Sequence, residues 1–542
     1  MRKTIFNFGI KMSLIMMCLI SVTTLTGCFE RESEYEIDPN RTQLYVGLYD
    51  GDLGSQWLKD VIAKYEAKNT DVQVILNLEK DLYGDVNLLT NMPSYNNDIY
   101  FLNGNTYSNY VAQGRLLDIT DAVTTKLDGE DKTIEDKMDD TLQSHYQLSN
   151  GKYYAVPFFD AIFGTIYDVD LFEQEGFFIN SDGELICDSA NEELSAGPNG
   201  VFGDYDDGLP ATMSEWKMLV DTMNISGITP YTWTGQYPLY RQRFISSIWA
   251  DYEGKTNFDL NMSLNGQYTF EGDSTPTTIT LENGYLLKNQ KGQEYALEMA
   301  KYIIEKSYYT SNAFDSVNTH QMAQQSFLLS ATEGKRIAMI FEGGWWENGS
   351  RTFFDTMASR YGDDYAYGTR RFGFMPAPKA DDGSSDPGTT LISSTGNSFV
   401  CISSKTTQAE LAKDFLKFVH SDESLRTFTR VTGSLRPYEY DLTQTDRDEM
   451  TYFANMMFDI YRDEKTQISY TNIYSNDVFY KEPSYLSYAN WSLGAEINGY
   501  STNDPFYEFS QSASLTVSQY LQGMKSRYSK SSWDKELGKY FK

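Results

Sequence analysis

Several aromatic and polar side chains directly follow predicted strands, which is where open α/β sheets place their ligands. Trp345 comes after Gly343 and Gly344 at the end of a predicted buried strand, so its ring can emerge at the edge of the sheet. An indole ring presents a broad apolar face that suits stacking on the C–H face of a sugar. Packing in the core is the alternative role. Two neighbouring residues are further candidates, Glu342 and Trp346. Glu342 could accept hydrogen bonds from hydroxyl groups, and the alternative is a simple solvated acid.

Other candidates for ligand binding follow other predicted strands. They are Asp50 and Gly51 after the first strand, Asn103 and Asn105 after a later strand, and Trp233 and Gln236 in the loop 232–237. The loop combines an aromatic platform with an amide, while the other positions offer carboxylate and amide groups of the kind that fix hydroxyls. A capping or turn role is the alternative for Asp50, Asn103 and Asn105.

Residues 177–211 interrupt the pattern and are rich in Gly, Asp and Asn, so we expect a long structured loop. Its clustered oxygen donors include Asp182, Glu184, Asp204, Asp206 and Asp207. A hard cation such as calcium takes about six to eight oxygen ligands on a flexible loop. The spacing does not fit an EF-hand, and we favour the alternative of an acidic surface loop held by Asx turns. We therefore expect no cofactor to be required, with calcium as the metal that this loop would suit.

No recognised catalytic motif is present in the sequence. His-Glu-x-x-His, Gly-x-Ser-x-Gly and a Walker loop are all absent. His145, His320 and His420 lie in unrelated contexts and have no metal-ligand spacing. Glycoside hydrolysis needs two placed carboxylates, and 76 acidic residues do not exclude such a pair. These observations favour a binding protein over an enzyme and leave a surface glycosidase as the alternative.

The N-terminus is typical of an export signal with a lipid attachment site. Basic residues and a short apolar run, residues 12–20, precede Leu25-Thr26-Gly27-Cys28, which resembles a bacterial lipobox. The run is shorter than the roughly 20 residues of a membrane span. An ordinary signal peptide with a chance cysteine is the alternative. We expect removal of residues 1–27, diacylglycerol on Cys28, a tether over residues 28–42, and anchoring on the outer face of the bacterial cell membrane.

The amino-acid composition limits the classes of ligand and partner that the protein can bind. The formal net charge is −31, so nucleic acid is a poor partner. Aromatic residues make up 15% of the chain, a bias that suits neutral, hydroxyl-rich ligands. Cys187 and Cys401 remain after the N-terminal cysteines are assigned, and we expect both to be unpaired.

Strand-like and helical patterns alternate along the chain. Runs at 44–48, 72–76 and 98–102 have the character of strands, and apolar residues within 57–65 recur at helical spacing. Such alternation predicts βαβ units and a mainly parallel sheet. The last hundred residues look mainly helical. The chain is longer than one hydrophobic core usually serves, so two lobes are expected.

A series of short motifs occurs in order between residues 43 and 440. The motifs are 98–101, 154–158, 167–172, 209–216, 334–339, 343–345, 372–378 and 396–398, followed by the helix 408–420, Ser421, Gly433 and Pro437. Together they resemble the carbohydrate-binding solute-binding lipoproteins of ABC importers, the class that includes maltose-binding protein. The insertion at 177–211 and the C-terminal extension depart from this pattern.

The resemblance implies an α/β, two-lobed periplasmic-binding-protein-like fold with a hinge and an interlobe ligand cleft. We expect residues 43–157 and 370–430 in the first lobe, and 158–369 and 431–542 in the second. The resemblance places a ligand-stacking tryptophan at Trp345. Asp160, which follows the crossover between the lobes, Asn397 in a Gly-Asn-Ser turn and Arg436 are further candidates for ligand binding.

The function that the resemblance implies is capture of an oligosaccharide by hinge closure and delivery to ABC permease subunits, by a monomer. Ligand that binds the closed form more tightly shifts the two lobes toward closure. The alternatives are a surface glycoside-acting lipoprotein enzyme, a binding protein for a non-sugar solute, and a binding module that serves a signalling receptor.

Overall fold

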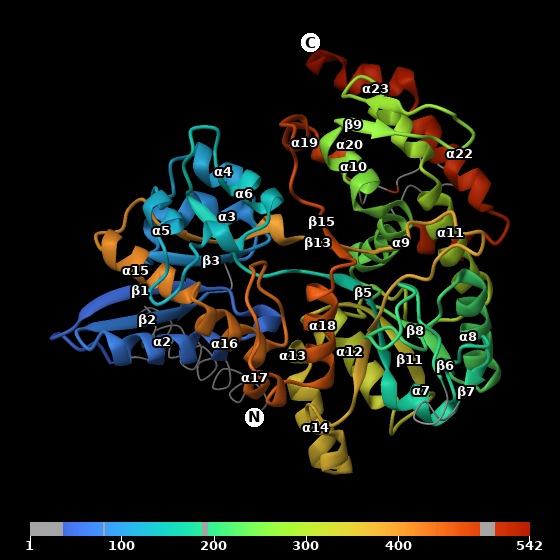
Figure 1. Cartoon of the computed structure of the whole chain (residues 1–542), viewed down its shortest axis with the longest axis horizontal. Helices are drawn as coiled ribbons and strands as arrows, with labels where there is room; N and C mark the ends of the chain where they lie inside the picture. Colours follow the sequence, from blue (N-terminus) through green and yellow to red (C-terminus); the bar gives the residue numbers. More distant parts are fainter. Residues whose placement is uncertain (1–35, 80–81, 187–192, 488–490, 492–503, 542) are drawn as a thin grey trace, which may run out of the picture.

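The computed structural model describes residues 36–79, 82–186, 193–487, 491 and 504–541. Two lobes lie side by side in Figure 1, one mainly blue and orange and the other mainly green and yellow. Each lobe has an open sheet with helices around it, which confirms the predicted α/β, two-lobed fold class. In the part of the chain described, no helix has both the length and the apolar character needed to cross a membrane.

The first lobe is built on a five-stranded sheet of order β2-β1-β3-β14-β4. The strands are β1 (Thr42–Leu48), β2 (Val72–Leu78), β3 (Ile99–Asn103), β4 (Ala155–Pro157) and β14 (Ser398–Ile402). β1 pairs in parallel with β2 and β3, while β14 runs antiparallel to β3 and β4. The strands predicted at 44–48, 72–76 and 98–102 are confirmed.

Helices cover this sheet through apolar faces that the sequence pattern indicates. In α2 (Gln56–Lys68) the buried side chains are Trp57, Leu58, Val61, Ile62 and Tyr65, which recur every three or four residues. α15 (Ala409–Val419) and α16 (Asp422–Thr432) pack nearby, and Tyr65 donates a 2.6 Å hydrogen bond to Asp414 of α15. The first lobe therefore joins segments from both halves of the chain.

The second lobe has a four-stranded sheet of order β12-β5-β11-β8. The strands are β5 (Phe163–Asp168), β8 (Thr229–Thr232), β11 (Ile337–Gly343) and β12 (Phe372–Met375). β12 pairs antiparallel with β5, so the prediction that the first lobe resumes at residue 370 is wrong at this strand. The chain continues through β13 (Thr389–Ser393) before it returns to the first sheet at β14.

Helices around the second sheet position much of the site described below. They are α7 (Val169–Glu175), α8 (Met213–Ile225), α9 (Pro238–Phe258), α11 (Lys291–Glu305), α12 (His320–Leu329), α13 (Trp346–Gly349) and α14 (Arg351–Tyr361). α8 begins with a capping box in which the Thr212 hydroxyl accepts from the Glu215 backbone N–H and the Glu215 side chain accepts in return. This helix start lies where the motif at 209–216 predicts it.

Three chain segments cross between the lobes and form the hinge, residues 158–162, 393–397 and 433–437. The Asp160 N–H donates to Leu435 O at 2.8 Å, and the Ser394 N–H donates to Ala161 O at 3.2 Å. β-Bridges join Asp160 to Leu435 and Ile162 to Ser393. The crossings therefore lie side by side and are held together by backbone hydrogen bonds.

The insertion and the C-terminal region add to the second lobe. β6 (Phe178–Ile179) and β7 (Leu185–Ile186) form a small hairpin in the insertion, and β15 (Thr466–Tyr470) pairs in parallel with β13. The described C-terminal part is mainly helical, as predicted: α17 (Gln444–Asp448), α18 (Tyr452–Arg462), α19 (Val478–Lys481), α20 (Pro483–Leu486), α21 (Pro505–Gln511), α22 (Val517–Arg527) and α23 (Lys530–Leu537). Cys401 is buried and unpaired, as predicted, while Cys187 and Cys28 lie outside the described residues.

Candidate ligand-binding cleft

A cleft of about 520 Å³ lies between the two lobes beside the hinge. The first lobe contributes the turns after β1 and β3, the second lobe contributes β5, α9, α12 and the turn after β11, and the hinge forms one side. The lining residues are Tyr49, Asp50, Gly51, Asp52, Leu53, Tyr83, Asn103, Gly104, Phe158, Phe159, Ala161, Phe163, Tyr237, Leu239, Tyr240, Arg243, His320, Trp345, Ser394, Asn397 and Asn472.

Aromatic rings form the wall that the second lobe presents to the cleft. The Trp345 and Phe163 rings meet edge to face with centroids 4.9 Å apart, and Phe163 meets Tyr240 in the same way at 5.1 Å. Phe159 of the hinge also meets Trp345 edge to face, at 6.5 Å. Rings locked by such contacts keep their faces in fixed positions, which gives a bound ligand a rigid apolar platform.

The local backbone explains how Trp345 reaches the cleft while Trp346 does not. β11 ends at Gly343, and a Cβ at that position would lie 2.3 Å from the Trp345 ring, so glycine allows the indole to fold back over the strand end. Trp345 stays partly exposed. Trp346 begins α13 and is fully buried, with its ring 4.9 Å from that of Phe372. The two adjacent tryptophans therefore have different roles.

The first lobe presents a polar wall with two tyrosines. Tyr49 and Tyr83 pack together with ring centroids 5.2 Å apart. Asp50 and Asp52 flank Gly51, whose φ of 38° is in the left-handed region that favours glycine and turns the chain sharply after β1. The cleft thus combines carboxylates with phenol rings on the side opposite Trp345.

Amide and guanidinium groups complete the polar lining. Asn103, at the end of β3, accepts a 2.7 Å hydrogen bond from the Ser398 hydroxyl, and this contact fixes its orientation. Arg243 on α9 lies over the face of Phe163, 4.5 Å from the ring centroid. Arg243 thereby brings a positively charged guanidinium group, which donates hydrogen bonds, to the cleft lining.

A histidine and an aspartate from different lobes meet across the cleft. His320 Nε2 at the start of α12 lies 3.6 Å from Asp52 Oδ2. Burial lowers the pKa of His320, but the Asp52 carboxylate, together with Glu342, outweighs burial and the net pKa is raised. Protonation of His320 therefore strengthens a contact that exists only while the lobes are together.

Ligand affinity should be about 2- to 5-fold higher near pH 6 than near pH 8.5. The pKa is raised where His320 faces Asp52 across the cleft, so the stabilisation by this contact is complete below the ordinary histidine pKa and is lost as the pH rises through the raised value. Calorimetric titration of the ligand at several pH values measures the effect. His320→Gln should flatten the dependence of ligand affinity on pH. The same measurement is repeated in a Glu342→Gln background, because the neighbouring Glu342 carboxyl also titrates. An unchanged slope in His320→Gln would contradict this origin.

Five of the twelve predicted binding residues line the cleft: Asp50, Gly51, Asn103, Trp345 and Asn397. Gln236 is exposed but lies outside the lining. Asn105 is fully buried, donates to Leu82 O and Asn103 O, and accepts from Tyr110. These two amides are therefore not placed as predicted.

Two further predictions fail because the aromatic or acidic side chain lies in the interior. Trp233 is fully buried and stacks on Phe341, with centroids 5.0 Å apart and an interplanar angle of 8°. Glu342 is also buried, accepting from Gln324 and from the Gly343 N–H, and burial raises its pKa to about 8. Trp346 is enclosed in the core, as described above.

Asp160 and Arg436 belong to the hinge region and do not line the cleft. Asp160 is 4% exposed and accepts hydrogen bonds from the hydroxyls of Ser393 and Thr395, and burial raises its pKa to about 6. Arg436 is fully buried and donates to His420 Nε2 at 2.8 Å. Their contacts are with the protein, so both side chains stabilise the hinge region.

Several lining residues were not predicted from sequence. Tyr237, Tyr240 and Arg243 lie at three-residue spacing on and just before the first turns of α9, a helical periodicity that could have identified one face. Asp52 follows the predicted Asp50-Gly51 turn by one residue. Asn472 carries no local signal, since only the return of the chain beside the hinge brings it to the cleft.

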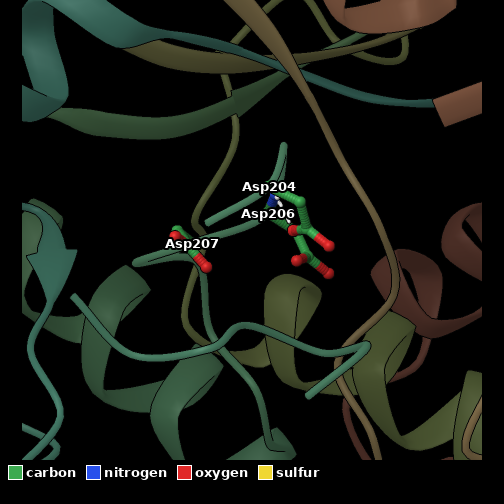
Figure 2. A group of neighbouring side chains, drawn as sticks. All are labelled: Asp204, Asp206 and Asp207. Atoms are coloured by element: carbon green, nitrogen blue, oxygen red, sulfur yellow. Dashed lines mark hydrogen bonds between the residues drawn. The ribbon is translucent and has the colours of Figure 1, made fainter. Parts of the chain in front are cut away.

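The predicted metal-binding residues separate into two sets. Asp204, Asp206 and Asp207 lie together, as Figure 2 shows, with one carboxylate oxygen of each within 4.8 Å of the others. Asp182 and Glu184 are not part of this group. Their backbone N–H groups donate to Asn180 Oδ1, which is the Asx turn that the alternative interpretation predicted.

A two-lobed α/β chain with a three-segment hinge and an aromatic, polar cleft defines a protein that binds a small solute between its lobes. The sequence profile described as bacterial extracellular solute-binding protein matches residues 50–425. The chain belongs to this family, which confirms the family resemblance noted in the sequence. No curated protein sequence matches the chain.

Solved structures share the fold at low sequence identity. The apo form of RafE from Streptococcus pneumoniae is 12% identical with a TM-score of 0.54, covering 92% of this chain and 100% of that one. A chitin oligosaccharide binding protein is 16% identical with a TM-score of 0.54, covering 91% and 100%. The bacterial solute receptor AcbH is 12% identical with a TM-score of 0.54, covering 93% and 100%. At these identities the similarity concerns the fold.

Proposed function

We propose that this chain captures an oligosaccharide in the interlobe cleft and delivers it to the permease of an ABC importer. The observation that carries the proposal is the pairing of a fixed aromatic wall, centred on Trp345, with a facing wall of carboxylates, amides and tyrosines. Sugars have apolar faces and an equator of hydroxyl groups, so both walls find matching groups on one ligand.

The structural relatives support this ligand class. RafE has been solved in complex with raffinose, and another relative is described as a chitin oligosaccharide binding protein, whereas AcbH is described as having an exclusive preference for the monosaccharide β-D-galactopyranose. The cleft volume of about 520 Å³ is in the range of small-ligand sites of roughly 300 to 1,000 Å³. Together with the spread of its aromatic residues, the cleft favours an oligosaccharide over a single sugar.

We also propose where the protein is held in the cell and that it does not chemically convert its ligand. We propose that the protein is a monomer held on the outer face of the cell membrane by diacylglycerol on Cys28, with residues 28–42 as its tether. The role is capture without chemistry, in keeping with a family of binding proteins. In this arrangement the hinge converts ligand binding into a change of shape that a permease can detect.

Thermal unfolding of the purified protein with a panel of saccharides tests the function. The panel contains monosaccharides, neutral oligosaccharides and oligosaccharides bearing uronic acids, the last because the positively charged Arg243 lines the cleft. One oligosaccharide class should raise the Tm, since ligand at about 100 times its Kd stabilises a protein by about 2.7 kcal/mol. Chromatography of the incubated sugar should show no products.

Each alternative has its own outcome in the same experiment. Release of smaller sugars would establish a glycosidase and contradict capture without turnover. A Tm shift with peptides but with no saccharide would make the chain a binding protein for a non-sugar solute. Binding of an oligosaccharide with no change in its cellular uptake when the gene is deleted would favour a signalling role over import.

A further inference from the structure

The loop of residues 197–208, which we call the Asp loop, concentrates negative charge away from the cleft. Asp204, Asp206 and Asp207 bring three carboxylates together, and no residue of the loop lines the cleft. In Figure 2 the carboxylates of Asp204 and Asp206 point the same way, while Asp207 approaches from the other side of the loop. Like charges at such distances repel unless a proton or a cation lies between them.

Asp206 is the central member of the group and is 0% exposed. Its Oδ2 accepts a 3.1 Å hydrogen bond from the Asn199 N–H, but its enclosed Oδ1 has no hydrogen-bond donor among the described residues. Asp207 repeats the pattern, since its Oδ2 accepts from the Gly203 N–H at 2.7 Å and no described donor reaches its enclosed Oδ1. Enclosed acceptors of this kind are uncommon in folded proteins and call for a donor, which can be a proton, a water molecule or a cation.

The protein itself supplies little compensation within the described residues. Lys465 approaches the loop, but its Nζ donates to the peptide oxygen of Asn199 at 3.3 Å and not to a carboxylate. Asn199 Nδ2 donates to Asp204 Oδ2 at 2.8 Å, which is a neutral contact. The group therefore has unfilled acceptors and excess negative charge at once.

We propose that the Asp loop binds one calcium ion through the carboxylates of Asp204, Asp206 and Asp207. The donor set contains only oxygen, which suits a hard cation and not zinc or copper. Calcium accepts flexible loops and irregular geometry, whereas magnesium demands a near-octahedral shell and keeps its waters. Peptide oxygens of the loop and water would complete the coordination.

The ion would act on the stability of the second lobe rather than on ligand contacts. Tyr205, between two of the aspartates, places its hydroxyl 3.5 Å from the Thr389 hydroxyl and 3.4 Å from that of Thr466. These threonines lie at the starts of β13 and β15, and β13 leads into the hinge. A cation that fixes the Asp loop thus fixes the strands beside the hinge.

The test compares metal responses of the full chain after treatment with chelator and dialysis. At about pH 7.5, millimolar CaCl2 should raise the Tm by about 3 °C or more, and MgCl2 at equal ionic strength should raise it less. Asp206→Asn should lose the calcium response. The matched control Asp182→Asn changes an exposed acid on the neighbouring hairpin and should keep the response. Terbium bound in the loop should emit light when Tyr205 is excited, and added calcium should displace the terbium and remove this emission.

Asp206→Asn also distinguishes a bound cation from a bound proton. If calcium fills the site, the metal-free variant should be more stable than the metal-free wild type, and the order should reverse in calcium. A calcium response equal in both proteins would overturn the assignment. A wild type whose Tm does not change with calcium at any pH between about 6 and 8.5 would also overturn it. If Asp206→Asn fails to fold, two other measurements test the site. Asp204→Asn should lose the calcium response, and calorimetric titration of the wild type should show one calcium ion bound per chain.

Discussion

Replacement of Trp345 by alanine should weaken oligosaccharide binding by about 1 to 3 kcal/mol, roughly 5- to 150-fold in Kd. The ring is partly exposed in the cleft and is held edge to face by Phe163, so its removal takes away a prepared platform without opening the core. Calorimetric titration of the saccharide identified by the thermal screen measures the change. The midpoint of thermal unfolding without ligand should move little.

Two variants control for general effects of losing an aromatic ring. Phe202→Ala removes a ring that is 62% exposed and outside the cleft, and should alter neither affinity nor stability. Trp346→Ala should cost about 3 to 5 kcal/mol of stability, because its ring is fully buried, while the remaining folded protein binds normally. Unchanged affinity in a folded Trp345→Ala protein would show that the ligand lies elsewhere.

The second large effect concerns stability above neutral pH. Burial raises the pKa of Glu342 to about 8 and that of Glu347 to about 7, and both side chains lie in the interior. For an acid whose pKa is raised by folding, the native state holds its proton while the unfolded chain has lost it. Stability is therefore lost as the pH rises through the folded value, and we expect a decrease on the order of 2 to 4 kcal/mol between about pH 6.5 and 8.5.

Urea unfolding at a series of pH values, with chelator present throughout, measures this slope. Glu342→Gln should flatten it and raise stability at the alkaline end, whereas Asp128→Asn, at an exposed loop position, should leave it unchanged. Below about pH 6 the slope should become shallower, because burial holds the pKa of His145 at about 4 and that of His420 well below the ordinary value, and the two histidines oppose the carboxyls there. A stability that stays level from pH 6.5 to 8.5 would contradict the assignment.

Local patterns in the sequence predict most of the elements but not all of their partners. The strands β1, β2 and β3 and the buried face of α2 follow from apolar runs and helical spacing. The run that becomes β12 is equally clear as a strand, yet it was assigned to the wrong lobe. Its partner β5 lies about two hundred residues earlier, and pairing over such a separation leaves no trace in local periodicity.

The same limit explains the outcome for the candidate site. Trp233 and Trp345 both follow a predicted strand, and their own sequences do not separate them. Trp233 is covered by Phe341 and Phe506, which come from distant parts of the chain, while the Trp345 ring packs against Phe159 of the hinge and Phe163 of β5 and stays partly exposed. Residues at turns after β1 and β3 were predicted more successfully because the end of a strand fixes their direction with little help from elsewhere.

The position of β14 has a consequence for the order in which the chain acquires its structure. This strand is central in the first sheet, where Val400 pairs with Phe101 on one side and Val156 on the other. A chain that emerges with its N-terminus first holds β3 for about 295 residues of synthesis and β4 for about 240 before β14 exists to join them. Long-range pairing of this kind is slow. Until then β3 keeps an unpaired edge that invites association with other chains. Substitutions that slow the folding of the second lobe should therefore increase aggregation or proteolysis of the first lobe.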